Sequence, residues 1–148
     1  FRPHNVYGPD MGYDHVIPEF FNTIIPQLNN DTIKLKIQGS GNETRSFIFI
    51  DDFIDGLIIL LNKGKFNNIY NIGTEDEISI KKLIDKMSNV INKNIVIKNK
   101  NLKEGSILRR CPSIKKIKKL GFSPSTTLND GLRKTFEWYL KNLENKVL

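Results

Sequence analysis

The chain has 148 residues, a formal net charge of +7 and 39% hydrophobic residues, enough apolar side chain for one domain with a single core. The longest apolar stretch runs from Phe53 to Leu61 and is interrupted by Asp55 and Gly56. That stretch is too short and too polar to cross a bilayer. Length and composition therefore argue against collagen, long disordered tracts, multidomain arrays and membrane-spanning proteins.

The cysteine content and the first residues suggest a compartment. The single cysteine, Cys111, cannot form an internal disulfide, which is typical of a reducing compartment. No charged and then apolar leader opens the chain. We therefore expect a cytoplasmic protein without a membrane partner. Because the chain opens with Phe1 in what has the pattern of a domain interior, we also expect it to be a piece of a longer protein.

The positive charge has a simple compositional origin. Lysine supplies 18 of the 23 cationic side chains, and asparagine, isoleucine and lysine together make up more than a third of the chain, whereas alanine is absent. The codons of AT-rich genomes favour this composition, and lysine then accumulates on solvated faces. Net charge bears on association and not on fold. Because composition explains the charge here, we do not expect a nucleic-acid partner from it.

The first part of the chain predicts a strand, a helix and a second strand. Residues 1–7 end at Gly8-Pro9, which is typical of a strand that runs into a loop. Apolar residues at helical spacing predict a helix over 15–28, and Pro26 should bend or end its last turn. Strict alternation over 33–37 predicts a half-buried strand.

The middle of the chain predicts a strand followed by a helix. A turn at 39–42 precedes a strand over 45–50, and a helix should follow over 53–63. Asp51 or Asp52 is the expected N-cap, because carboxylates favour helix N-termini. We prefer this capping role to a metal or acid-base role for the paired carboxylates.

The second half alternates short strands with helices. Strands are predicted over 68–72 and 95–97, and helices over 80–91, 114–120 and 127–143. This order of elements, without repeats or linkers, predicts one α/β or α+β unit.

Three of these helices should begin at capping side chains. The expected caps are Ser79, Ser113 and either Thr127 or Asn129. The polar segment 99–106 is predicted to be a surface loop.

Five short motifs follow one another along the chain. They are Arg2-Pro3-His4-Asn5-Val6-Tyr7-Gly8-Pro9, Gly39-Ser40-Gly41 with Arg45 and Ile50-Asp51-Asp52, Asn71-Ile72-Gly73, Leu108-Arg109-Arg110, and Gly131-Leu132-Arg133 through Tyr139. In this order and spacing the chain resembles the C-terminal half of extended short-chain dehydrogenase/reductases, the NAD-dependent nucleotide-sugar epimerases and dehydratases. The resemblance covers essentially all of residues 1–148. It implies an α/β fragment, the end of a Rossmann-type sheet plus the small substrate-binding domain of these enzymes.

Two motifs of the family are absent from this sequence. The ten glycines contain neither G-x-x-G-x-x-G nor G-x-G-x-x-G, and none of the four tyrosines has a lysine four residues on. In the family, the N-terminal half carries both the glycine loop that cradles the NAD pyrophosphate and the Tyr-x-x-x-Lys pair that supplies the base. The resemblance therefore implies that NAD is bound mainly by a missing half and that this chain alone is inactive. No catalytic residue is assigned to it.

The resemblance implies that Asn5 and Arg45 bind the substrate near its diphosphate. An amide donates to oxygen without adding charge, and a planar guanidinium can bind two phosphate oxygens at once. The alternative for Asn5 is a turn-closing role. The alternative for Arg45 is a surface ion pair with Glu43 or Asp51, which would contribute little.

A second phosphate-binding position is implied at Arg109 or Arg110. Relatives have an arginine at one or the other position, and we slightly prefer Arg109. The alternative is a solvated charge run that continues into the lysines of 115–119.

The remaining implied contacts concern the cofactor and the nucleobase. Pro3 and His4 lie where the chain of relatives passes the nicotinamide, although His4 departs from the usual residue and could simply pack. His15 and Val16 begin the helix that approaches the nucleobase in relatives. Gln38 replaces an aromatic residue that stacks on uracil or thymine, and its amide could pair with a base edge instead. We expect a UDP- or dTDP-linked sugar as substrate.

Other functions stay open at this point. The chain could be a non-catalytic nucleotide-sugar or nucleic-acid binding module, or a gene remnant that does not fold. The type of reaction, whether epimerisation, dehydration or decarboxylation, is not determined. No set of His, Cys, Asp and Glu has metal-ligand spacing, so no metal site is predicted. Relatives pair through the half that is missing, so a homodimer of the full-length enzyme is one expected assembly.

Overall fold

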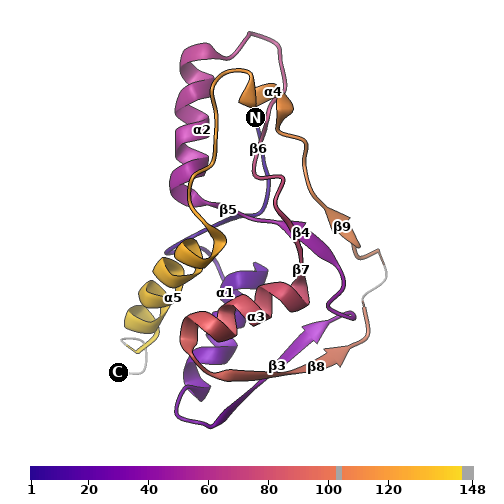
Figure 1. Ribbon diagram of the computed structural model, residues 1–148, viewed down its shortest axis with the longest axis vertical. Coiled ribbons are helices and arrows are strands. Elements are labelled where there is room, and N and C mark those ends of the chain that lie inside the picture. Colours follow the sequence, from indigo (N-terminus) through magenta and orange to yellow (C-terminus); the bar gives the residue numbers. More distant parts are fainter. Residues whose placement is uncertain (103–104, 145–148) are drawn as a thin grey trace.

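The computed structural model describes residues 1–102 and 105–144, whose helices and strands form a mixed α/β arrangement with mostly parallel strand pairs (Figure 1). The strand orders are β1-β6, β2-β5, β3-β8 and β7-β4-β9, and the β4–β7 pair is antiparallel. The elements in chain order are β1 (Arg2–Pro3), β2 (Val6–Tyr7), α1 (Val16–Ile24), the 3-10 helix η1 (Ile25–Gln27), β3 (Thr32–Gln38), β4 (Thr44–Ser46), β5 (Ile48–Phe49), α2 (Ile50–Lys63), β6 (Asn71–Ile72), β7 (Glu77–Ser79), α3 (Ile80–Ile91), β8 (Asn94–Lys100), β9 (Arg109–Arg110), α4 (Lys115–Lys118) and α5 (Leu128–Glu144).

The strand predicted over 1–7 is divided into β1 and β2 at Asn5. Asn5 has a φ of 43°, in the left-handed region that asparagine tolerates better than most residues. Its Nδ2 donates to the carbonyl of Ser46 at 2.7 Å, which holds the bend. The bend directs β1 to β6 and β2 to β5, so one predicted strand serves two sheets.

The strand predicted over 45–50 is divided in the same way. β4 lies between β7 and β9, whereas β5 pairs with β2. Sequence periodicity does not predict β7 or β9, because strands of three and two residues are too short to show it. These two strands nevertheless decide how the candidate site is built.

The predicted strand with strict alternation is confirmed and is longer than expected. β3 pairs in parallel with β8 over 7 residues, and Ile33, Leu35 and Ile37 are buried in the core that α1 and α3 cover. Figure 1 shows both helices on the same side of these two strands. The predicted cap of α3 is also confirmed, because Ser79 Oγ accepts from the N–H of Lys82 at 3.2 Å.

The helix predicted over 15–28 is confirmed in its position and shortened at its end. α1 ends at Ile24, and the chain tightens into the 3-10 turn η1, which has Pro26 near its start. Proline lacks the N–H that an α-helix needs at this point, which explains the change. In the segment predicted to be a loop, 99–106, β8 continues through Lys100, and residues 103–104 lie outside the described part of the chain.

The predicted capping role of Asp51 and Asp52 is wrong. The N-cap of α2 is Phe49, and no side chain accepts a hydrogen bond there. Asp52 is buried in the first turn, where its carboxylate accepts from the N–H and hydroxyl of Ser125 at 3.1 Å each, and from the N–H of Thr126 at 2.9 Å. The carboxylate therefore holds the segment that leads into α5, a tertiary contact that local pattern cannot reveal.

The other two capping predictions have opposite outcomes. Ser113 does not cap α4; the N-cap is Ile114, whose N–H donates to the carboxylate of Glu75 at 3.2 Å. Thr127 does initiate α5, because its Oγ1 accepts from the N–H of Asp130 at 3.2 Å.

Two apolar clusters hold the described elements together. The larger one joins α1, β3, α3 and α5 around Phe21 and Tyr139, which are both fully buried. The smaller one lies under α2 and α4 around Ile72 and Phe122. In residues 1–102 and 105–144, no helix combines the length and the apolar character that crossing a membrane requires.

Candidate functional site

A cleft of about 400 Å³ opens between β2, α1, β3, β4 and the segment that leads into β9. Six of the seven residues predicted to bind substrate line this cleft, although they come from five separate parts of the sequence. They are Asn5, His15, Val16, Gln38, Arg45 and Arg110. The fold thus gathers side chains from Asn5 to Arg110, more than a hundred residues apart, into one site of the size that small molecules occupy.

Arg45 occupies the middle of β4 and is half-buried at the cleft. Its Nη1 donates to the carbonyls of Thr44 at 2.7 Å and Leu108 at 3.3 Å, and its Nη2 donates to the carbonyl of Ile107 at 2.5 Å. Burial lowers the pKa of Arg45, and so does the nearby charge of Arg110. Backbone carbonyls orient this guanidinium without neutralising it.

The alternative ion pairs for Arg45 are not formed within the described residues. Asp51 pairs instead with Lys134 on α5, at 3.7 Å. The Glu43 carboxylate is used by the preceding turn, where it accepts from the N–H of Ser40 at 3.0 Å and from the N–H of Gly41 at 2.8 Å. Both partners proposed from sequence therefore have other roles.

The turn at 39–41 owes its shape to two glycines and Glu43. Gly39 and Gly41 have φ values of 82° and 81°, which side-chain-bearing residues adopt only with strain. A Cβ on Gly39 would lie 2.5 Å from Oε1 of Glu43. This tight turn joins β3 to β4, so it sets the distance between Gln38 and Arg45 at the cleft.

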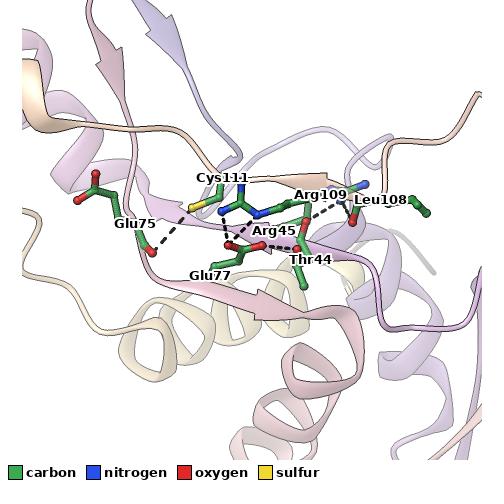
Figure 2. A network of polar contacts seen from close by, with 7 residues as sticks. All are labelled: Thr44, Arg45, Glu75, Glu77, Leu108, Arg109 and Cys111. Atoms are coloured by element: carbon green, nitrogen blue, oxygen red, sulfur yellow. Dashed lines mark hydrogen bonds and ion pairs between the residues drawn. The ribbon is translucent and has the colours of Figure 1, made fainter.

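The structure separates the two adjacent arginines of β9. Arg110 is opposite Arg45 in the parallel register and lines the cleft. Arg109 is opposite Thr44 and donates to Glu77 Oε2 through Nη2 at 2.7 Å and through Nε at 3.1 Å (Figure 2). Because neighbouring side chains of a strand point to opposite faces, both arginines cannot enter one cleft. The cleft lining therefore contains Arg110 and not Arg109, the arginine that the sequence slightly favoured.

The network around Glu77 ties all three strands of this sheet together. Thr44 Oγ1 on β4 donates to Glu77 Oε1 on β7, while Arg109 on β9 uses the other oxygen (Figure 2). Hydrogen bonds from Thr44 and Arg109 lower the pKa of Glu77, so it is a carboxylate at neutral pH. Sequence reasoning missed this network because β7 and β9 have no periodic signal.

The residues predicted near the nucleobase lie at the cleft, where few contacts within the described residues hold their side chains. His15 is the exposed N-cap of α1 and makes no capping hydrogen bond, and Val16 is half-buried beside it. Gln38 is the exposed last residue of β3. Lys36, two residues earlier on the same face of β3, also lines the cleft and was missed, although the alternation of β3 could have revealed it.

Asn5 has the turn-closing role considered for it, and it also lies at the cleft. Its amide closes the bend through Ser46, and its side chain belongs to the cleft lining. Among the residues that the structure describes, one amide hydrogen and the carbonyl oxygen of that side chain have no partner.

Pro3 and His4 lie outside the cleft lining, at the carboxyl end of β1. The N–H of His4 donates to the carbonyl of Ile72 at 3.1 Å, and its Cβ lies 3.0 Å from where a Cβ on Gly73 would stand. This position fits a packing histidine. Its Nε2 is buried and has no hydrogen-bond partner in the described part of the chain. Within residues 1–102 and 105–144, no group of His, Cys, Asp and Glu could hold a metal ion.

Comparison with known proteins assigns the chain to a family. The family model "NAD dependent epimerase/dehydratase family" matches residues 1–73. The human dTDP-D-glucose 4,6-dehydratase is 34% identical over 151 residues, which cover 97% of this chain and 42% of that protein. The chain belongs to the NAD-dependent epimerase/dehydratase family. The resemblance inferred from the motifs is thus confirmed.

Solved structures of the epimerase/dehydratase type have the same fold. UDP-glucuronic acid 4-epimerase from Bacillus cereus, in complex with UDP-glucuronic acid and NAD, is 30% identical with a TM-score of 0.81, over 96% of this chain and 44% of that chain. UDP-glucose 4-epimerase from Thermotoga maritima, with UDP-glucose, is 25% identical with a TM-score of 0.85, over 96% of this chain and 45% of that chain. The predicted α/β, Rossmann-type fold class is confirmed. The chain spans less than half the length of each of these relatives.

Proposed function

We propose that the protein is the substrate-binding part of an NAD-dependent nucleotide-sugar epimerase or dehydratase, which acts by transient or net hydride transfer on the sugar. The observation that carries this proposal is the pair of arginines, Arg45 and Arg110, which line one cleft as register neighbours on adjacent strands. Neighbouring strands of a sheet are about 4.8 Å apart, so the side chains of Arg45 and Arg110 leave the backbone close to each other. Neither group has an ion pair within the described residues.

Two neighbouring cations that form no ion pair within the described residues suit a dianionic group. The diphosphate of a nucleotide-sugar carries two negative charges on adjacent phosphates, and guanidinium groups bind phosphate oxygens in a planar, bidentate way. In this proposal Arg45 and Arg110 bind the diphosphate, and Asn5 donates its free amide hydrogen to a nearby oxygen. Gln38, His15 and Val16 border the nucleobase.

NAD would meet this chain at the carboxyl end of β1, where parallel α/β sheets bind their ligands. Pro3 and His4 stand at that end, and the unpartnered Nε2 of His4 fits a polar neighbour there. When bound, NAD accepts a hydride from the sugar. The pyrophosphate cradle and the catalytic base must come from outside this chain, because it contains neither motif. On this proposal the chain alone binds substrate without turning it over.

Calorimetric titration with UDP-glucose, dTDP-glucose and UDP-glucuronic acid tests the proposal. We expect saturable binding of at least one of them by the protein. Arg45→Gln should weaken it about tenfold to a hundredfold, the worth of a charged hydrogen bond. Arg133→Gln is the matched control, because Arg133 is an exposed arginine of α5 outside the cleft lining. An equal loss in both variants, or no saturable binding, would contradict the proposal.

The assembly and the location of the protein also remain proposals. We propose a homodimer for the full-length enzyme and a cytoplasmic location, in line with the single cysteine. Sedimentation of the full-length enzyme and imaging of a tagged protein would test these two statements.

A further inference from the structure

The outer face of the β3–β8 sheet carries a compact group of lysines. Lys34, Lys36, Lys98 and Lys100 are all exposed on it, and we call these four residues the lysine face. The parallel register puts Lys36 directly opposite Lys98. With about 4.8 Å between strands and about 6.6 Å between alternate residues, the backbone positions of the four lysines lie within roughly 14 Å of one another.

This arrangement is electrostatically unfavourable in the absence of an anion. Like charges directly across a strand pair repel each other. In the described part of the chain, none of the four ammonium groups has an ion pair or a hydrogen bond. The other face of the same sheet is filled by the core side chains Ile33, Leu35 and Ile37, so the charges cannot spread to it.

The lysine face is continuous with the cleft at one rim. Lys36 belongs to both, and Gln38, the next residue on the same face of β3, also lines the cleft. On the α1 side of the cleft, the lining includes the exposed carboxylates of Asp14 and Glu19. An anion is therefore attracted along the sheet and repelled from the helix side.

We propose that the lysine face is an electrostatic entry surface that steers an anionic nucleotide-sugar into the cleft and raises its association rate. This inference rests on the proposed function, because it takes the same ligand for the same cleft. Three of the lysines, Lys34, Lys98 and Lys100, are not in the cleft lining, so they act on the approaching ligand and not on the bound one. Exposed charges of this kind accelerate association by about tenfold or more at low salt, and screening over about 10 Å removes the effect.

Stopped-flow association of fluorescent, methylanthraniloyl-labelled UDP-glucose with the protein tests the proposal. The variant Lys34→Gln/Lys98→Gln/Lys100→Gln leaves the cleft lining intact. A control variant replaces three exposed lysines outside the lining, by Lys65→Gln, Lys119→Gln and Lys141→Gln. Both variants lower the net charge equally, and thermal unfolding verifies that both fold.

We expect the lysine-face variant to associate about tenfold more slowly at about 20 mM salt, with a dissociation rate within about twofold of the unsubstituted protein. The difference should vanish at about 0.5 M salt, and the control variant should associate normally. Equal slowing in both variants would overturn the proposal, because net charge would then explain it. Unchanged association combined with lost binding to random-sequence RNA would also overturn it, in favour of a polyanion surface. If the unsubstituted protein binds no nucleotide-sugar, the proposed function itself fails.

Discussion

Glu77 on β7 and Arg109 on β9 meet across β4, with 2.7 Å between Oε2 and Nη2. The contact occupies Arg109 on the face of the sheet away from the cleft, and it leaves Arg110 on the cleft face. The two adjacent arginines therefore have different roles, one in holding β9 and the other in the candidate binding site.

Arg109→Gln and Arg110→Gln should have different effects on ligand affinity. Arg110→Gln removes a cation from the cleft and should weaken binding of a nucleotide-sugar about tenfold or more. Arg109→Gln should change affinity by no more than about threefold, because an exposed ion pair contributes little. Calorimetric titration of both variants measures this. A larger loss for Arg109→Gln would restore the preference drawn from the sequence.

Asp52→Asn should destabilise the protein far more than Asp51→Asn. Asp52 is buried and accepts three hydrogen bonds from Ser125 and Thr126, so its loss should cost about 1–3 kcal/mol of unfolding free energy. Asp51 is exposed and only 3.7 Å from Lys134, so its variant should stay within about 0.5 kcal/mol. Urea denaturation gives both values. Equal destabilisation would mean that the Asp52 carboxylate does not hold the segment before α5.

Gly39→Ala should destabilise the turn that leads to Arg45. The residue has a φ of 82°, and a Cβ would stand 2.5 Å from the Glu43 carboxylate, so we expect a loss of about 1–3 kcal/mol. Gly12→Ala is the control, because a Cβ there meets nothing within 4 Å. Thermal unfolding compares the two. A Gly39→Ala variant as stable as Gly12→Ala would show that the turn tolerates a side chain.

Stability should fall in acid through carboxylates whose pKa lies below the ordinary value. Burial alone would raise the pKa of Glu43, but hydrogen bonds from its own backbone, Ser40 and Gly41 lower it below 4.5, and Thr44 and Arg109 do the same for Glu77. A group with a lowered folded pKa stabilises the protein above its unfolded pKa, and this contribution is lost as pH falls through the folded pKa. Unfolding free energy should therefore decrease below about pH 5. Glu43→Gln should flatten this decrease, and an unchanged profile would contradict the assignment.

Local sequence patterns predict an element correctly where a single feature, such as alternation, a capping side chain or a proline, is clear. The alternation of β3, the Ser79 cap of α3 and the end of α1 near Pro26 all depend on residues a few positions apart. The cleft residues outside such patterns, such as Asn5 and Arg45, were reached through the family motifs. Lys36 was within reach of the β3 alternation and was missed, whereas the Glu77 network had no signal at all.

The sequence by itself determined the fold class, the main helices and the family, because periodicity and the order of motifs depend on residue types that can be recognised from sequence alone. The tertiary structure decided that Asp52 serves a segment 73 residues away rather than its own helix, and that Arg110 instead of Arg109 enters the cleft. Both outcomes depend on which segments become neighbours. The direction of a side chain on a two-residue strand is set by its pairing register, and that register is fixed by contacts between residues far apart in the chain.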